Sequence, residues 1–298
     1  MNLMKLFAGL VIMCSCKAQH KSPDLPIQKN NNTLLWEVTG KNVKTASYIF
    51  GTFHLMCKDD IHFSPALLKA VQFADTVYME LDMDDPSIML GGMMMMNMKD
   101  GKKLKDFYTE SEYKRLSDFF KDSIGVPIVM MQSMKPSMLE ALLYPKMLAC
   151  NTSTGVDMEL MALAKKDKKE INGLETLAFQ ASVFDSIPYE EQAKGLLKAI
   201  DSLDDYKKDF DSIVQVYKSQ RIDDIERMLA KGDFGDDMEA NGDVLLYNRN
   251  RNWIKQLKQI MAKENVFVAV GAGHLVGDKG LIALLKKEGY TVRPVLNQ

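Results

Sequence analysis

Two histidines follow glycine-containing turns in similar sequence contexts. The first lies in Gly51-Thr52-Phe53-His54 and the second in Gly271-Ala272-Gly273-His274, and each turn follows an apolar, β-branched run. Glycine lets the backbone bend sharply at the end of a strand, which exposes the side chain that follows. Either histidine alone would suit a hydrogen-bonded structural residue. Because the G-x-x-H pattern occurs twice, we interpret His54 and His274 as functional residues.

A glutamate, Glu80, lies in the otherwise apolar stretch VYMELDM near the first motif. A carboxylate there must be paired, bind a metal or lie at an exposed strand end, because an unpaired buried charge is too costly. Two histidines and one glutamate form a ligand set that leaves positions for water and substrate, as in metal-assisted hydrolysis. Three further acids follow closely, namely Asp82, Asp84 and Asp85. We therefore predict a divalent ion at His54, Glu80 and His274, with manganese, cobalt and zinc all admissible.

The glycines of the second motif also allow a nucleotide-binding interpretation. Gly271, Gly273 and Gly277 form a G-x-G-x-x-x-G pattern after an expected strand. A dinucleotide site needs an acidic residue near the end of the next strand to bind the ribose hydroxyls. The next strand here is YTVRPV, which contains no acid. The sequence therefore favours the presentation of His274 as the role of these glycines.

The elements around the two motifs have the same predicted order of strand, loop, helix and strand. In the first unit, strands are expected over residues 34–40, 46–54 and 75–83, with a helix capped by Ser64 and begun by Pro65. The second unit contains the strand VFVAV, the helix GLIALLKKEG and the strand YTVRPV. We predict an α/β fold in which both units share one mixed sheet, with a mainly helical insertion over roughly residues 100–263.

The N-terminus has the features of an export signal that ends in a lipidated cysteine. A basic residue, an apolar run and small residues precede Cys16, and Cys14 is the alternative lipidation site. We expect a signal peptide over residues 1–15, a polar tether over 16–33 and one domain over 34–298. The protein would then be anchored by its lipid in the cell envelope, facing the periplasm or the surface, and simple secretion is the alternative.

Composition limits the classes of partner. The chain has 298 residues, of which 46% are hydrophobic and 26% charged, and its formal charge is −2. This charge argues against nucleic acid as a partner. Cys57 and Cys150 could pair in an oxidising compartment, but two cysteines without further pattern leave that open. The methionine-rich stretch IMLGGMMMMNM fits an adaptable apolar surface better than a copper site.

Several stretches together resemble the TraB/PrgY/GumN family, which includes the animal Tiki proteases. They are YIFGTFH, VYMELDM, GVDMELMALAKKDKKEINGLETLAFQ, YNRNRNW and VAVGAGHLVGDKGLIALLKKEGYTVRPV, and they extend from about residue 34 to residue 295. The resemblance implies a peptidase-like fold with an active centre at His54, Glu80 and His274. The sequence departs from the family pattern in HLMCKDD, which lacks a proline soon after the histidine.

The same resemblance marks further positions. Asp157, Glu175, Gln180 and Asn250 would support the fold or bind substrate, and Arg249 would bind a carboxylate or stabilise an oxyanion. We thus expect a metal-dependent hydrolase, a Tiki-like peptidase acting on a peptide or protein. The alternative is a non-catalytic envelope protein that sequesters a peptide, a sugar fragment or a haem-like ligand in the same cleft.

Overall fold

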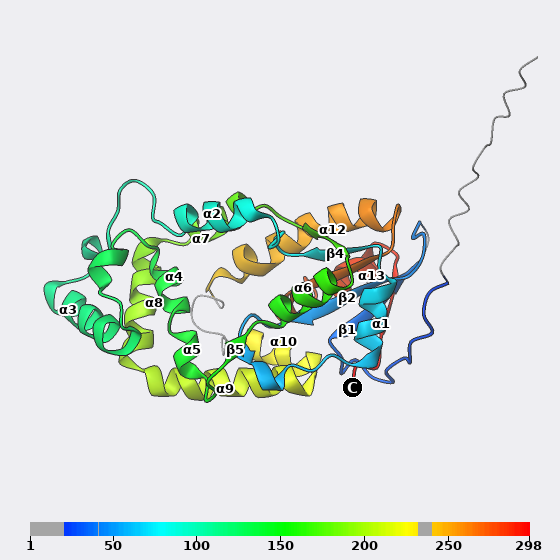
Figure 1. The fold of residues 1–298 in the computed structure, drawn as a ribbon, viewed down its shortest axis with the longest axis horizontal. Helices are drawn as coiled ribbons and strands as arrows, with labels where there is room; N and C mark the ends of the chain where they lie inside the picture. The colour runs from blue at the N-terminus through cyan, green and yellow to red at the C-terminus, as the bar shows by residue number, and fades with distance from the viewer. Residues whose placement is uncertain (1–20, 41, 232–239) are drawn as a thin grey trace, which may run out of the picture.

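The computed structural model describes residues 21–40, 42–231 and 240–298 (Figure 1). The predicted signal peptide and the predicted lipidation site at Cys16, with its alternative Cys14, lie outside the described residues. Among the described residues, no helix combines the length and the apolar character that crossing a bilayer requires.

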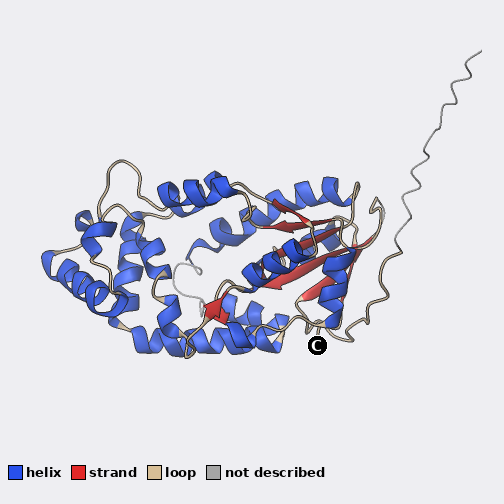
Figure 2. Ribbon diagram, in the orientation of Figure 1, coloured by secondary structure: helices blue, strands red, loops and turns tan. Residues whose placement is uncertain are grey.

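A six-stranded mixed sheet forms one half of the molecule (Figure 2). Its order is β6-β4-β7-β2-β1-β8. The strands are β1 (Leu35–Thr39), β2 (Ser47–Thr52), β4 (Thr76–Met79), β6 (Glu170–Gly173), β7 (Val266–Gly271) and β8 (Thr291–Pro294). The four strands from β6 to β2 are parallel, whereas β1 runs antiparallel to both of its neighbours. The predicted mixed α/β fold is confirmed.

The two central strands, β2 and β7, lead to the two histidine motifs. Every residue of β2 is buried, and β7 is buried up to its last residue, Gly271. Such continuous burial suits strands that are covered on both faces. The two strands pair in parallel, with Thr52 opposite Gly271, so both G-x-x-H turns leave the sheet at the same edge.

Helices cover the sheet and form the other half of the molecule. Those described are α1 (Pro65–Phe73), α2 (Pro86–Met95), α3 (Glu110–Phe119), α4 (Pro136–Ala141), α5 (Tyr144–Met147), α6 (Val156–Lys166), α7 (Leu177–Asp185), α8 (Tyr189–Asp201), α9 (Leu203–Ser219), α10 (Ile222–Lys231), α12 (Asn248–Met261) and α13 (Leu281–Lys287). Figure 1 shows α3 and α8 at the end far from the sheet, while α9 extends along one side from that end towards the sheet. The described residues form two apolar cores, one around the sheet and one within the distant helices.

Local signals explain the helix ends that the sequence predicts. The Ser64 side chain accepts a hydrogen bond from the Leu67 N–H, and Pro65 occupies the first turn of α1, as predicted. After α13, Gly289 adopts a φ of +87°, a conformation that glycine adopts without steric cost. Strand β6 was not predicted, because it is a short edge strand in which only Ile171 is fully buried and no apolar alternation marks it.

A disulfide bond joins Cys57 to Cys150 across 93 residues of chain, which settles the pairing that the sequence leaves open. It lies beside a separate two-stranded sheet of β3 (Met56–Cys57) and β5 (Ser153–Thr154). This small sheet connects the loop after β2 to the start of α6.

Candidate active site

His274 is buried at the end of the second motif and is held by one asparagine. It closes the short 3-10 helix η6 (Ala272–His274), directly after β7, and its side chain is 3% exposed. The Nδ1 atom lies 2.7 Å from Asn250 Oδ1, while Asn250 Nδ2 donates to the His274 carbonyl at 3.1 Å and to the Lys279 carbonyl at 2.9 Å. Because the Asn250 oxygen can only accept, Nδ1 carries the proton and Nε2 presents its lone pair.

Arg249 joins three groups of the site through one guanidinium. Its Nη2 donates to Glu80 Oε2 at 2.5 Å and to Glu175 Oε1 at 2.6 Å, and its Nε lies 3.1 Å from both Glu175 oxygens. Its Nη1 lies 3.2 Å from His274 Nε2. Burial opposes the charge on Arg249, but the two carboxylates outweigh burial and raise its pKa. The guanidinium is therefore a fixed cation between two buried carboxylates and a neutral imidazole.

Glu80 follows directly after β4, rather than lying within the strand, so its carboxyl group is placed at the edge where β2 and β7 end. One oxygen, Oε1, accepts the Gly271 N–H at 2.8 Å. Burial alone would raise the pKa of Glu80, but His274, Arg249 and His54 together with the Gly271 N–H hold it well below its usual range. Glu80 is therefore a paired, ionised carboxylate and does not lie at an exposed strand end.

The two histidines have opposite protonation preferences. Burial lowers the pKa of His274 to about 3, with Arg249 acting in the same direction and Glu80 opposing it. For His54, desolvation lowers the pKa, but the hydrogen bond to Asp157 and the charge of Glu80 outweigh it and raise the pKa to about 9. His54 Nδ1 lies 3.2 Å from Asp157 Oδ2, and the His54 side chain is 66% exposed. His274 is thus neutral at pH 7, whereas the carboxylates near His54 favour its charged form.

The three predicted metal ligands border one small space beside Gly271. A Cβ atom added at Gly271 would lie 3.3 Å from Glu80 Oε1, and 3.7 Å from both His274 Cδ2 and His54 Nε2. Glycine therefore leaves room next to all three side chains. Within the described residues, no three His, Cys, Asp or Glu side chains are already arranged to hold an ion. The three side chains are of the types that bind a divalent ion and lie around the same glycine, but an ion would have to draw them together and take His274 Nε2 from Arg249.

The remaining predicted residues form a polar support around these groups. Gln180 Nε2 donates to Glu175 Oε1 at 3.1 Å. Trp253, which no sequence motif singles out, donates its Nε1–H to Glu175 Oε2 at 3.2 Å, and the centre of its ring lies 4.4 Å from that of the His274 ring. Trp253 stands four residues after Arg249 on α12, so helical spacing from that arginine is the signal that could have identified it.

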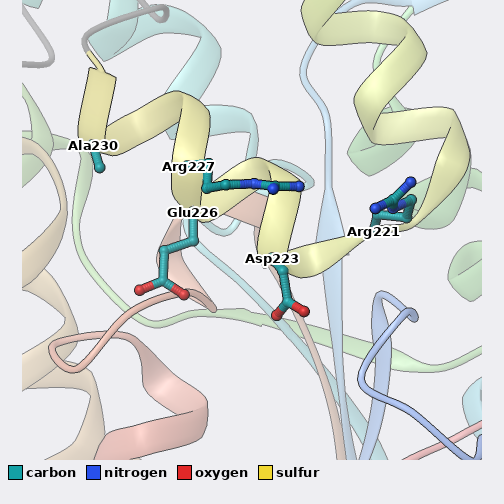
Figure 3. A pocket seen from close by; sticks show the side chains of 5 residues that line it. All are labelled: Arg221, Asp223, Glu226, Arg227 and Ala230. Carbon is teal, nitrogen blue, oxygen red and sulfur yellow. The ribbon is translucent and has the colours of Figure 1, made fainter.

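Other candidates lie apart from these contacts. Asp84 and Asp85 are exposed, and the pKa of Asp82 is raised to about 6 by desolvation and by its hydrogen bond to Asp84. His62 is exposed. A hollow of about 470 Å³ lies along α10, and Figure 3 shows the five residues that line it: Arg221, Asp223, Glu226, Arg227 and Ala230. None of the predicted site residues lines this hollow.

Comparison with known proteins identifies relatives across almost the whole domain. A model of the TraB/PrgY/gumN family matches residues 34–294. Metalloprotease TIKI1 of Xenopus tropicalis is 24% identical, over 93% of this chain and 63% of the relative. Metalloprotease TIKI2 of Danio rerio is 23% identical, over 98% of this chain and 68% of the relative. The Metalloprotease TIKI homolog of Amphimedon queenslandica is 27% identical, over 46% of this chain and 29% of the relative.

The chain thus spans 63% and 68% of the length of the two vertebrate relatives. No solved structure matches it.

In metal-free protein, the free energy of unfolding should be highest near pH 6.5. Below that pH the unfolded chain protonates His274, whereas the folded protein does so only near pH 3, so stability falls with acid. Above it the unfolded chain loses the His54 proton, whereas the folded protein keeps that proton until about pH 9, so stability falls between about pH 6.5 and pH 9. Urea denaturation with a chelator, from about pH 5 to about pH 9, measures the profile.

Two variants test separately the loss of stability on the acid side and on the alkaline side of this pH profile. His274→Gln should flatten the acid limb between about pH 6.5 and pH 5, where most carboxylates stay ionised. His54→Gln should flatten the alkaline limb. A wild-type stability that does not change over this range would contradict the protonation states assigned to both histidines.

Proposed function

Because the chain belongs to the TraB/PrgY/gumN family, we propose that it is a metal-dependent hydrolase that cleaves a peptide or protein. The observation that carries the proposal is the convergence of His54, Glu80 and His274 beside Gly271. Relatives named metalloproteases support peptide-bond cleavage. The position of all three side chains at one edge of the sheet supports a single reaction centre.

A manganese, cobalt or zinc ion would be held by Glu80 Oε1, His274 Nε2 and His54 Nε2, and His54 would have to lose a proton to bind it. When bound, such an ion polarises a substrate carbonyl and lowers the pKa of water. Each ligand has a partner that orients it. Asp157 engages His54 Nδ1 and so directs Nε2 towards Gly271, while Asn250 fixes the tautomer of His274. Such supporting contacts strengthen metal affinity by about 10-fold to 100-fold.

Arg249 supplies positive charge at the same place. Its guanidinium is kept in one orientation by Glu175, which in turn accepts from Gln180 and Trp253. A preoriented cation next to the reacting carbonyl stabilises the negative charge that develops on its oxygen. We assign this role to Arg249, and we assign to Glu175 and Gln180 the role of holding it in place.

We further propose that the protein acts in the cell envelope, anchored through a lipid on Cys16. The signal-like N-terminus supports this location, with simple secretion as the alternative. The Cys57–Cys150 disulfide also favours an oxidising compartment outside the cytoplasm.

One observation favours a second function. Arg249 engages both Glu80 Oε2 and His274 Nε2, two groups that an ion would use. A site that keeps this arrangement would bind a peptide, a sugar fragment or a haem-like ligand without cleaving it. The two functions differ in their response to metal.

Metal binding and cleavage should be lost together in His274→Ala. The substitution removes one of three ligands and should lower ion affinity by at least about 100-fold. Chelated protein would be supplied with manganese, cobalt or zinc and incubated with a mixed peptide library, with cleavage followed by mass spectrometry and ion content by elemental analysis. His62→Ala is the matched control, because His62 is an exposed histidine outside the site.

Metal-dependent cleavage by wild type and His62→Ala, but not by His274→Ala, would support the hydrolase. Peptide retention without cleavage, with or without metal, would support the binding protein instead. The proposal fails if wild type binds no ion and His274→Ala behaves as wild type.

Gly271→Ala should weaken ion binding while the fold persists. The added methyl group would lie 3.3 Å from Glu80 Oε1, which is tighter than ordinary contact, and would occupy the space that the three ligands share. We expect affinity to fall by about 10-fold or more, measured by isothermal titration, with an unchanged far-ultraviolet circular dichroism spectrum. An affinity equal to that of wild type would show that the ion binds elsewhere.

Binding of an ion should separate Arg249 from His274, and this separation should change the fluorescence of Trp253. The Arg249 guanidinium lies 4.9 Å from the centre of the Trp253 ring, so an ion that takes His274 Nε2 from Arg249 should change the fluorescence of that ring. The chain has two tryptophans, and a Trp36→Phe background isolates Trp253. Zinc titration should shift the Trp253 emission at the same concentration that saturates binding.

In that background, Arg249→Gln should bind zinc about 10-fold more tightly, because a competing cation is removed, and should lose cleavage. Binding that is weakened by Arg249→Gln would contradict competition between Arg249 and the ion.

A further inference from the structure

The loop that carries His54 is joined to the start of α6 by several contacts. Strands β3 and β5 pair Met56 with Thr154 and Cys57 with Ser153. The Lys58 N–H donates to the Thr152 carbonyl at 3.0 Å. The Cys57–Cys150 disulfide closes the outer end of this arrangement. The two segments therefore move as one unit only while these contacts persist.

The inner end of the same arrangement reaches His54 itself. The Val156 N–H donates to the Phe53 carbonyl at 2.8 Å. At Gly155 the backbones approach so closely that an added Cβ would lie 2.7 Å from the His54 carbonyl oxygen. Asp157, in the first turn of α6, then holds His54 Nδ1. The position of Asp157 against His54 thus depends on the register of these two segments.

Few other contacts hold the His54 ring. Its side chain is 66% exposed, and within the described chain Asp157 provides its one side-chain hydrogen bond. A ladder of two residue pairs is too short to be stable alone. The covalent bond is therefore the strongest link between the two segments.

His274 is held quite differently. It is buried, follows directly after β7 and is clamped by Asn250 from α12. Neither cysteine lies in these elements. Loss of the disulfide should therefore affect one histidine of the site and leave the other in place.

We propose that Cys57 and Cys150 are positioning residues for His54, and that reduction of their disulfide releases His54 from Asp157. Both cysteines are half-buried, so a small dithiol can reach them. The S–S bond takes two electrons and two protons from the dithiol, which becomes a cyclic disulfide while the protein gains two thiols. The consequence for catalysis rests on the proposed function, but the positioning of His54 does not.

Histidine ring resonances in isotope-labelled protein test this proposal. Four samples are compared: the oxidised protein, the protein reduced with dithiothreitol, Cys57→Ser/Cys150→Ser, and Asp157→Ala. The His54 signals of the reduced protein and of the double variant should move to their position in Asp157→Ala, while those of His274 and of the exposed His62 stay in place. Reoxidation of the wild type should restore the original spectrum, which keeps the test valid if the double variant does not fold.

Two further measurements complete the experiment. Amide exchange over residues 54–58 and 152–157 should accelerate at least about 10-fold on reduction, without change in β7. Zinc affinity should fall by about 10-fold, as expected when the partner of a ligand is lost. Dithiothreitol should leave the double variant unaffected.

An unmoved His54 signal after reduction would overturn the proposal. Joint movement of His54 and His274 would also overturn it, because the disulfide would then stabilise the whole fold rather than one ligand. If no ion binds in either redox state, the proposed function fails, and the His54 signals still decide whether the disulfide positions that residue.

Discussion

The parallel pairing of β2 with β7 is the constraint on which the rest of the site depends. It places Thr52 opposite Gly271, so two turns that are distant in sequence leave the sheet side by side. Strand β4 pairs with the other side of β7 and ends one residue before Glu80. Three side chains from three neighbouring strand ends therefore face a common region without any long loop. The carboxyl edge of a parallel sheet commonly carries function for this reason.

Charge balance explains why α12 must dock against this edge. Glu80 and Glu175 are nearly buried, and carboxylates in such surroundings need a partner because their hydration is lost. Arg249 supplies that partner for both, and its neighbour Asn250 fixes His274. Two adjacent residues of one helix thus serve both the stability of the fold and the orientation of a site residue. Because α12 carries both residues, it cannot shift without disturbing the site.

The sequence indicated the candidate residues of this site, but it did not indicate the contacts between them. The repeated G-x-x-H turns indicated His54 and His274, and an acid in an apolar strand indicated Glu80, because these signals are local. The placement of β4 beside β7, the pairing of His54 with Asp157 and the bridging by Arg249 depend on contacts between distant segments, which no local pattern encodes. The same reason left the Cys57–Cys150 bond undecided and hid β6, a short edge strand without alternation.

The disulfide also changes how far apart His54 and Asp157 are along the covalent structure. By the backbone they are separated by 103 residues. Through the bond, the path consists of three residues from His54 to Cys57, the bridge itself and seven residues from Cys150 to Asp157. The path is thus about ten times shorter, and a tenfold shorter path lowers the entropic cost of bringing the two side chains together by about 2 kcal/mol. In the oxidised chain, therefore, this contact between distant residues has become nearly local, and it re-forms at a low entropic cost whenever it opens.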